Sequence, residues 1–344
     1  MSDQKIRLYA YSLSHFAVDF CCALLILPLG RASFSPAMLY ILYNYCAFAL
    51  QMPLGILADK INRNALFAAV GCGLVAAGSS LPGLPVLAVS VMGIGNALFH
   101  VGGGVDVLND SGNRAASLGI FVSPGALGLY LGGLLTKTAL SASWFVVLCL
   151  MGLCILTILL SAGKTGVLVE SHNAEVSFRG LSRLSFLLPA LCLFLVVVLR
   201  SMVGMAASFP WKQKTLWGLI SVLAVVLGKA FGGIAMDKFG AKATSLVSLL
   251  LAGVLFLFAD IPFCGVPALF LFNMTMPVTL SLLAQKMPGC KGFSFGLLTF
   301  ALFLGFLPVG LSFVSALSGW MLALLSASSC LLLLPALLCK GGRS

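Results

Sequence analysis

The chain has 344 residues, of which 60% are hydrophobic and only 8% are charged. Soluble globular proteins carry roughly 25% charged residues, so this composition excludes a soluble protein and predicts an integral membrane protein. The formal net charge is +11, but the basic residues are scattered through short segments between apolar runs. We therefore expect no nucleic-acid partner and interpret these residues as orientation signals.

Apolar runs long enough for an α-helix to cross the hydrocarbon core recur along the whole chain. They predict an all-α integral membrane protein with twelve transmembrane helices. In chain order the predicted helices are 8–30, 37–58, 65–81, 84–108, 115–138, 142–162, 184–205, 215–236, 243–259, 262–284, 293–314 and 316–338. The longest polar stretch, 163–183, lies between the sixth and seventh helices. It predicts a linker between two six-helix bundles, residues 1–162 and 184–344.

Lysines and arginines are unevenly distributed between the two sides of the predicted membrane protein. Of the 20 in the chain, two lie within predicted helices, Arg200 and Lys229. Four lie on the side opposite the N-terminus: Arg31, Lys137, Lys212 and Lys214. All the others share the side of the N-terminus. Because cytoplasmic loops carry the excess of basic residues, we expect a multi-pass protein of the cell membrane with both termini in the cytoplasm.

A charged cluster occurs twice, 178 residues apart, each time after the second helix of a half. The copies are Gly55-Ile56-Leu57-Ala58-Asp59-Lys60-Ile61-Asn62-Arg63 and Gly233-Ile234-Ala235-Met236-Asp237-Lys238-Phe239-Gly240. Asn96 in the fourth helix corresponds in the same way to Asn273 in the tenth. This repeat predicts two similar halves related by an axis along the membrane normal, which is a transporter architecture.

With these motifs the chain resembles the major facilitator superfamily, whose signature after the second helix reads G-x-x-x-D-[RK]-x-G-[RK]. Within it, the fosmidomycin-resistance type of drug exporter is the most similar. That likeness rests on Ser14-His15-Phe16-Ala17-Val18-Asp19, on Gly93-Ile94-Gly95-Asn96-Ala97-Leu98-Phe99-His100 and on Leu199-Arg200-Ser201. The resemblance implies a monomeric secondary transporter that works by alternating access, exporting a drug or an organic anion in exchange for protons.

Asp19 lies about twelve residues into the first helix, near the middle of the predicted membrane. A carboxylate at that depth is costly unless it is protonated, paired or facing water, and proton-coupled carriers need such a group. His15 lies one helical turn away on the same face and could share or relay the proton. We therefore predict Asp19 and His15 as the proton-coupling residues; the alternative is a structural Asp19 that locks helix packing.

Further polar residues within predicted helices are candidates for a substrate cavity. In the superfamily the first, fourth, seventh and tenth helices line that cavity, and here these helices carry Asn96, His100, Arg200, Asn273 and Thr275. His100 is equally compatible with a helix-packing role. Arg200 could anchor an anionic substrate because its donors form a fork, could pair with Asp19 in one state, or could reach toward the outer membrane face.

The repeated loop charges predict a conformational gate on the cytoplasmic side. By resemblance, Asp59, Arg63 and either Asp106 or Asp110 form a charge network that stabilises the outward-facing state. Asp59 could also meet the positive end of a neighbouring helix. The predicted gate residues are Gly55, Asp59, Lys60, Arg63, Asp106, Asp110, Gly233, Asp237 and Lys238. The alternative is that these charges serve membrane topology alone.

Other functions stay open at this point. Uptake of a nutrient by proton symport uses the same fold and the same carboxylate. A transport-inactive sensor is a second alternative, because the exporter signature of the fifth helix survives only as Ser123-Pro124-Gly125 and Gly132-Gly133. We expect no enzyme, since no nucleophile-and-base or metal-ligand constellation is evident. We likewise expect no cofactor and no metal, and the predicted partners are a small-molecule substrate, protons and the lipid bilayer.

Overall fold

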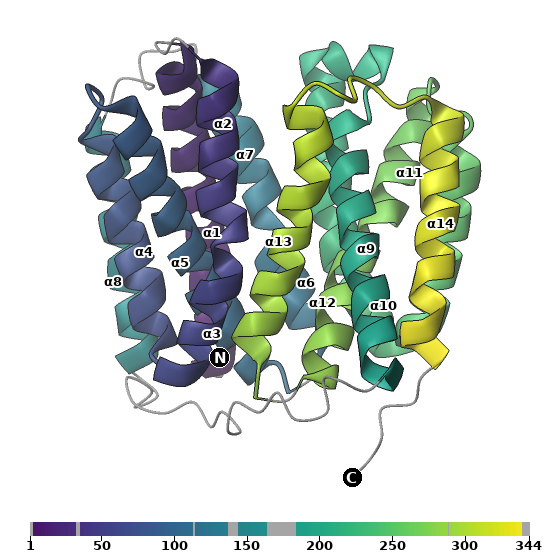
Figure 1. Ribbon diagram of the computed structural model, residues 1–344, viewed down its shortest axis with the longest axis horizontal. Helices are drawn as coiled ribbons and strands as arrows, with labels where there is room; N and C mark the ends of the chain where they lie inside the picture. Colours follow the sequence, from purple (N-terminus) through teal and green to yellow (C-terminus); the bar gives the residue numbers. More distant parts are fainter. Residues whose placement is uncertain are drawn as a thin grey trace. The chain divides into compact units, whose positions relative to one another are not determined.

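The computed structural model describes residues 3–31, 35–112, 114–136, 144–163, 184–287 and 289–338 (Figure 1). Within these ranges the regular secondary structure is helical throughout. The predicted linker lies outside the described residues, apart from Gly163.

In the first half, four of the six predicted helices are continuous, and the second and fifth are interrupted. The continuous helices are α1 (Asp3–Arg31), α4 (Asn64–Ser79), α5 (Pro85–Asp110) and α8 (Trp144–Gly163). The interrupted ones are α2 (Pro36–Asn44) with the π-helix η1 (Tyr45–Ala49) and α3 (Gln51–Ile61), and α6 (Ala115–Val122) with α7 (Pro124–Leu135). Pro53 and Pro124 each lie in the first turn after an interruption, where a missing N–H is tolerated.

The second half has one such interruption, between α11 and α12. Its elements are α9 (Leu184–Ala206), the 3-10 helix η3 (Pro210–Gln213), α10 (Thr215–Phe256), α11 (Pro262–Asn273), α12 (Thr275–Lys286), α13 (Lys291–Gly310) and α14 (Gly319–Leu338). The 42 residues of α10 cover two predicted helices, and Gly240 kinks the run with φ 83°. The loop expected after Asp237 is therefore a single left-handed glycine, a conformation that costs glycine little.

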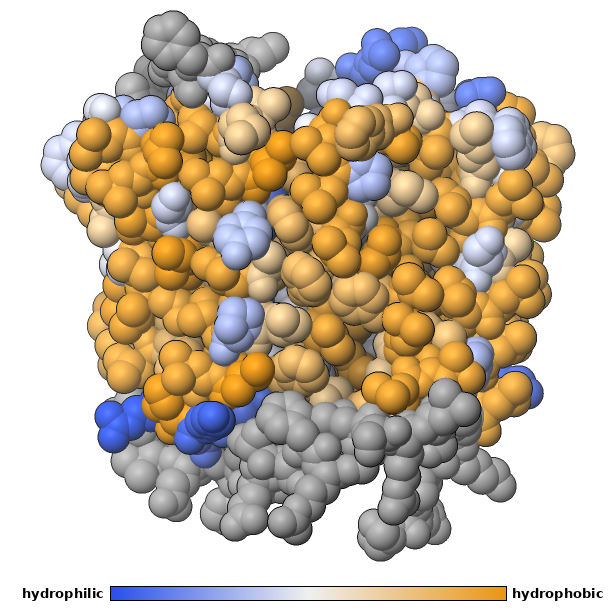
Figure 2. Space-filling model, in the orientation of Figure 1, coloured by the Kyte–Doolittle hydropathy of each residue, from blue (hydrophilic) through white to orange (hydrophobic). Residues whose placement is uncertain are grey.

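The described residues contain ten helices long and apolar enough to cross a membrane when interrupted helices are taken as continuous. One of the ten is the double-length α10, and α4 is a further, shorter apolar helix. These helices together account for the twelve predicted crossings. Hydrophobic residues cover most of the surface in view, and hydrophilic ones gather near the helix ends (Figure 2). The expected all-α membrane fold is confirmed.

The chain packs as two compact units. Each unit contains most of one sequence half and the start of one helix from the other half. Unit 1 comprises Met1–Gly112, Phe121–Val176 and Gly289–Phe300. Unit 2 comprises Asn113–Ile120, Ser177–Pro288 and Ala301–Ser344. The first turns of α13 therefore pack with the first half, and the first turns of α6 pack with the second.

Small residues allow close helix packing within unit 1, where α4 lies against α5 and α8, and α1 lies against α7 (Figure 1). A side chain at Gly102 would collide with the α4 backbone, and one at Gly128 or Gly132 would collide with the α1 backbone. Small residues commonly allow such close approach between membrane helices. Gly133 differs, because a methyl group there would meet only Leu27 Cδ1 at 3.7 Å.

Candidate functional site

One face of α1 carries a polar side chain at every fourth position: Arg7, Tyr11, His15 and Asp19. All four side chains are buried. Residues four apart lie on one face of an α-helix, and this face packs against α5. The result is a series of polar contacts between α1 and α5.

The first contacts in this series involve acids that were predicted as gate residues. The Nε and Nη2 of Arg7 donate to the two carboxylate oxygens of Asp110 at 2.8 and 2.6 Å. The Tyr11 hydroxyl donates to Asp106 Oδ2 at 2.5 Å. Neither acid is brought to Arg63, which is exposed. Arg7 and Tyr11 were missed as site residues, although their four-residue spacing from His15 was visible in the sequence.

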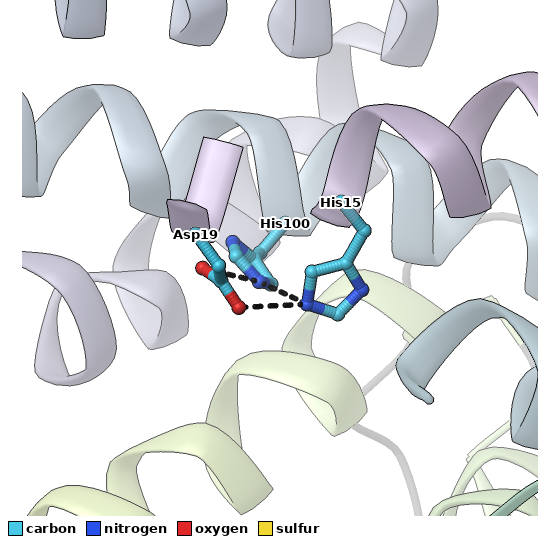
Figure 3. Close-up of side chains that lie close together, drawn as sticks. All are labelled: His15, Asp19 and His100. Atoms are coloured by element: carbon cyan, nitrogen blue, oxygen red, sulfur yellow. Dashed lines mark hydrogen bonds and ion pairs between the residues drawn. The ribbon is translucent and has the colours of Figure 1, made fainter. Parts of the chain in front are cut away.

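Further along α1, four buried side chains form a compact cluster: His15 and Asp19 from α1, and Asn96 and His100 from α5 (Figure 3 shows three of them). The Nε2 atoms of His15 and His100 lie 2.8 Å apart. Asp19 Oδ2 lies 3.3 Å from His15 Nε2, and Asp19 Oδ1 lies 3.8 Å from His100 Nε2. Asn96 Nδ2 donates to Asp19 Oδ1 at 3.1 Å. We call these four residues the His–Asp cluster.

Backbone carbonyls determine which nitrogen of each imidazole carries hydrogen. His15 Nδ1 lies 2.7 Å from the carbonyl oxygen of Phe121, and His100 Nδ1 lies 2.8 Å from that of Asn96. A carbonyl oxygen only accepts, so both Nδ1 atoms must be protonated. If both imidazoles were neutral, each of the facing Nε2 atoms would carry a lone pair and no hydrogen. A contact of 2.8 Å between them fits one proton shared between the rings.

The α6–α7 interruption shapes one wall of the His–Asp cluster. Phe121 lies in the last turn of α6, where the carbonyls have no partner within the helix. The Phe121 carbonyl accepts from His15 Nδ1 instead, and Pro124, which has no N–H, begins α7. The α-carbon of Gly125 faces the same cluster, where a methyl group would collide with the His15 ring and the Asp19 carboxylate. The fifth-helix motif Ser123-Pro124-Gly125 thus packs directly against the proton-coupling residues predicted from the sequence.

Three donors of the cluster are close enough together to hold one small cation. The ligand atoms of His15, Asp19 and His100 lie within 4.8 Å of one another, the one such group of three found in the described part of the chain. No metal site was predicted from the sequence, in which His100 lies far from His15 and Asp19. Because the two imidazole nitrogens lie only 2.8 Å apart, the geometry suits one shared proton better than a metal ion, whose ligand nitrogens lie farther from one another.

A second polar contact lies in unit 2, between α9 and α12. Arg200 Nη2 donates to Thr279 Oγ1 at 3.0 Å, and the hydroxyl of Thr279 in turn donates to the carbonyl of Met276 at 2.9 Å. Arg200 is 6% exposed, and its Nε has no hydrogen-bond partner in the part of the chain that the structure describes. Thr279 was not predicted, since a hydroxyl among apolar neighbours gives no clear signal.

The other predicted cavity residues of the second half bond within their own helices. Asn273 Nδ2 donates to the carbonyl of Leu269 at 2.8 Å, and the Thr275 hydroxyl donates to that of Phe272 at 3.0 Å. These local bonds do not bring Asn273 or Thr275 to Arg200.

The first copy of the repeated motif binds the start of α13. The carboxylate of buried Asp59 accepts from the backbone N–H groups of Gly292 at 2.7 Å and Phe293 at 2.9 Å. These are among the N–H groups that a helix start leaves without intrahelical partners, and the helix dipole favours an anion there. A side chain at Gly55 would collide with the Gly292 carbonyl, so glycine permits this approach.

The second copy makes the same contact with the start of α6. Asp237, which is exposed, accepts from the N–H groups of Ala115 at 2.8 Å and Ala116 at 2.9 Å. A side chain at Gly233 would collide with the carbonyl of Ala115. Lys60 and Lys238, the basic residues of the two copies, are exposed.

Comparison with known proteins gives the fold. A scan against protein-family models finds no match, and no curated protein matches the chain. Among solved structures, the E. coli fucose:proton symporter FucP (N162A) is similar with a TM-score of 0.69 and 13% identity over 99% of this chain and 100% of that one. FucP in the outward conformation gives a TM-score of 0.68 and 14% identity over the same shares.

A bacterial homologue of the iron transporter ferroportin, in its outward-facing state, gives a TM-score of 0.66 and 14% identity over 98% of each chain. At identities this low the likeness establishes the fold and leaves substrate and direction open. The chain has the fold of the major facilitator superfamily transporters.

Proposed function

We propose that this protein is a proton-coupled secondary transporter that moves a small organic solute by alternating access. Its fold is shared with a fucose:proton symporter and an iron transporter homologue. The sequence motifs favour export of the fosmidomycin-resistance type, with a drug or an organic anion as cargo. In this proposal, the two sequence halves move relative to each other as a monomer in the cell membrane, with both termini in the cytoplasm.

The single observation that carries the proposal is the His–Asp cluster. One proton between the two Nε2 atoms makes a singly positive imidazole pair, and the Asp19 carboxylate neutralises it. When that proton leaves, two lone pairs face each other beside an uncompensated carboxylate, which is costly within the membrane. Deprotonation therefore favours separation of α1 from α5. A site whose packing depends on one proton is what coupling requires.

The cluster also has a packing route to the predicted gate. Phe121, whose carbonyl receives His15, has its ring centroid 6.5 Å from that of Phe295 in α13. The backbone N–H of Phe293, two residues before Phe295, is bound by Asp59. In this proposal, a movement of His15 displaces Phe121 and, through Phe295, shifts the start of α13, which Asp59 binds. In this role Asp59 and Asp237 are gate residues, and exposed Lys60, Arg63 and Lys238 contribute to membrane topology.

Two other functions are separated from export by their predicted behaviour. A proton symporter for nutrient uptake would use the same His–Asp cluster and carry its solute inward, as the name of the fucose:proton symporter says of that protein. A transport-inactive sensor would bind a ligand without net flux. The cation-binding geometry gives no reason to prefer the sensor.

Growth of an efflux-deficient bacterium that produces the protein tests the direction of transport. The panel contains toxic compounds, including phosphonate antibiotics, and the control is the Asp19→Asn variant with its membrane content verified. We expect resistance that the variant loses. Increased sensitivity would support uptake. An unchanged response to every compound, together with no proton movement in proteoliposomes, would overturn the proposal.

A second arm asks which cation the cluster holds. Proteoliposomes with an imposed pH gradient, prepared with and without a strong metal chelator, separate a proton from a metal ion. Coupled flux that survives chelation supports the proton. Flux that disappears with the chelator and returns on addition of zinc or iron(II) would contradict it.

A further inference from the structure

Arg200 is a buried cation whose counter-charge is missing. Arg200 is only 6% exposed, and its Nε is enclosed without a hydrogen-bond partner among the described residues. The guanidinium does not lose its proton in proteins, and an uncompensated charge is strongly disfavoured in a membrane interior. Such a group needs an anion.

The acidic side chains that the structure describes either have other hydrogen-bond partners or lie at helix ends. Five aspartates have the partners given above: Asp19, Asp59, Asp106, Asp110 and Asp237. Asp3 begins α1, and Asp260 is exposed in the turn before α11. No ion pair with Arg200 occurs within the described ranges. The counter-charge is therefore not supplied by the described part of this chain.

Thr279 holds the guanidinium in a defined orientation. Its hydroxyl uses its hydrogen on the Met276 carbonyl, so it can only accept from Arg200 Nη2. Nε lies on the same edge of the planar guanidinium as one hydrogen of Nη2, and this edge matches two oxygens of a carboxylate or phosphonate.

We propose that Arg200, positioned by Thr279, is the binding site for an oxyanion group of the transported solute, a carboxylate or a phosphonate. This inference rests on the proposed transport function and names the substrate class. Arg200 Nε and Nη2 donate to two oxygens of the anion. Thr279 is a positioning residue that touches the guanidinium and not the anion.

Equilibrium binding to the purified full-length protein tests this site without any need for transport. The probes are benzoate and phenylphosphonate, each compared with its neutral counterpart, benzamide or dimethyl phenylphosphonate, in nanodiscs of zwitterionic lipid. We expect the anions to raise the melting temperature and the neutral compounds not to. Equal effects of the anionic and neutral probes would overturn the proposal.

Variants separate charge from geometry. Arg200→Gln should abolish the anion effect. Arg200→Lys keeps the charge but loses the fork, and should weaken binding at least about tenfold. Lys229→Gln, which removes a cation from α10, is the matched control and should bind as the wild type does. Anion binding that survives in Arg200→Gln would place the site elsewhere and reject the inference.

The role of Thr279 has its own test. Thr279→Val has nearly the same shape but no acceptor for Nη2, so we expect weaker binding and a smaller preference for anions over neutral probes. Thr279→Ser should restore both. A Thr279→Val variant with full anion preference would show that the hydroxyl does not position Arg200.

Two controls identify the source of the anion and the reason for any failure. Mass spectrometry of the purified protein asks whether an anionic lipid is retained by the wild type and lost in Arg200→Gln; that result would assign the site to a lipid phosphate and overturn the solute assignment. Binding lost only in Arg200 variants tests this inference, and coupling lost in Asp19→Asn tests the proposed function.

Discussion

The same pair of helices in each sequence half, the first and the fourth, carries a buried polar contact, but the two contacts have opposite charge. In the first half, α1 and α5 bring together His15, His100 and Asp19, a set of donors that needs a cation. In the second half, α9 and α12 bring together Arg200 and Thr279, a cation that needs an anion. The polar contacts therefore lie on corresponding helices of the two halves, but one set of side chains binds a cation and the other carries a positive charge.

This difference suggests a division of labour between the two halves. The His–Asp cluster is compact and contains its own counter-charge, so a proton can neutralise it completely. Arg200 has no acid to complete it in the described part of the chain, so its partner must arrive from outside. One half would then hold the coupling ion and the other the solute, and the predictions below test that separation.

The largest effect is expected from Asp19→Asn. The amide keeps the size of the side chain but cannot neutralise the positive imidazole pair, so uphill transport driven by a pH gradient should fall to background. Exchange of solute across proteoliposomes without a gradient should persist, because Arg200 is untouched. An unchanged pH dependence of transport in Asp19→Asn would show that the two halves are not divided in this way.

His100→Gln should reduce gradient-driven transport at least about tenfold, since a glutamine forms hydrogen bonds but cannot share a proton at physiological pH. Flux in proteoliposomes at several pH values provides the measurement. His172→Gln is the matched control, because His172 is the third histidine of the chain and lies in the predicted linker. If His100→Gln kept the wild-type pH profile, the proton would belong to Asp19 and His15 without the imidazole pair.

Gly125→Ala should perturb the same cluster sterically. The new methyl group would collide with the His15 ring and the Asp19 carboxylate, and forced overpacking costs about 1–3 kcal/mol. We expect a lower melting temperature and impaired coupled flux. Gly133→Ala lies on the same helix with room for a methyl group and should leave both near wild type. Equal behaviour of the two variants would mean that Gly125 does not constrain the cluster.

The smallest effects are expected at the repeated motif, and they should be unequal. Asp59→Asn removes a buried charge from the start of α13 and should cost about 1–2 kcal/mol. Asp237→Asn removes an exposed charge from the start of α6 and should cost about 0.5 kcal/mol. Melting temperatures in detergent measure both. A larger loss for Asp237→Asn would contradict the link between burial and strength at these helix starts.

Much of the fold followed from patterns that act locally. Long apolar runs predicted the crossings because a helix is the structure that satisfies its own backbone within lipid, and the repeat of Asp59 and Asp237 indicated two related halves. The interruptions at Ser123 and Met274 were not predicted. Apolar composition stays the same across them, so hydropathy alone does not reveal where a helix breaks.

The partners of the site residues were harder to predict. The spacing of His15 and Asp19 already placed them on one face, since four residues make about one turn. That His100 Nε2 meets His15 Nε2 depends on how α5 packs on α1. Likewise, the charges on Asp106 and Asp110 were visible, but their engagement with Tyr11 and Arg7 follows from the register between two helices.

The sequence by itself determined that this is a twelve-crossing membrane protein of two similar halves, with Asp19, His15 and Arg200 as exceptional polar residues. Hydrophobicity and helical periodicity are properties of neighbouring residues, so a linear chain displays them directly. Only the tertiary structure decided that His15 and His100 meet at their Nε2 atoms, that Asp59 caps α13, and that Arg200 donates to Thr279. These facts depend on contacts between helices distant in the chain, which no local pattern encodes.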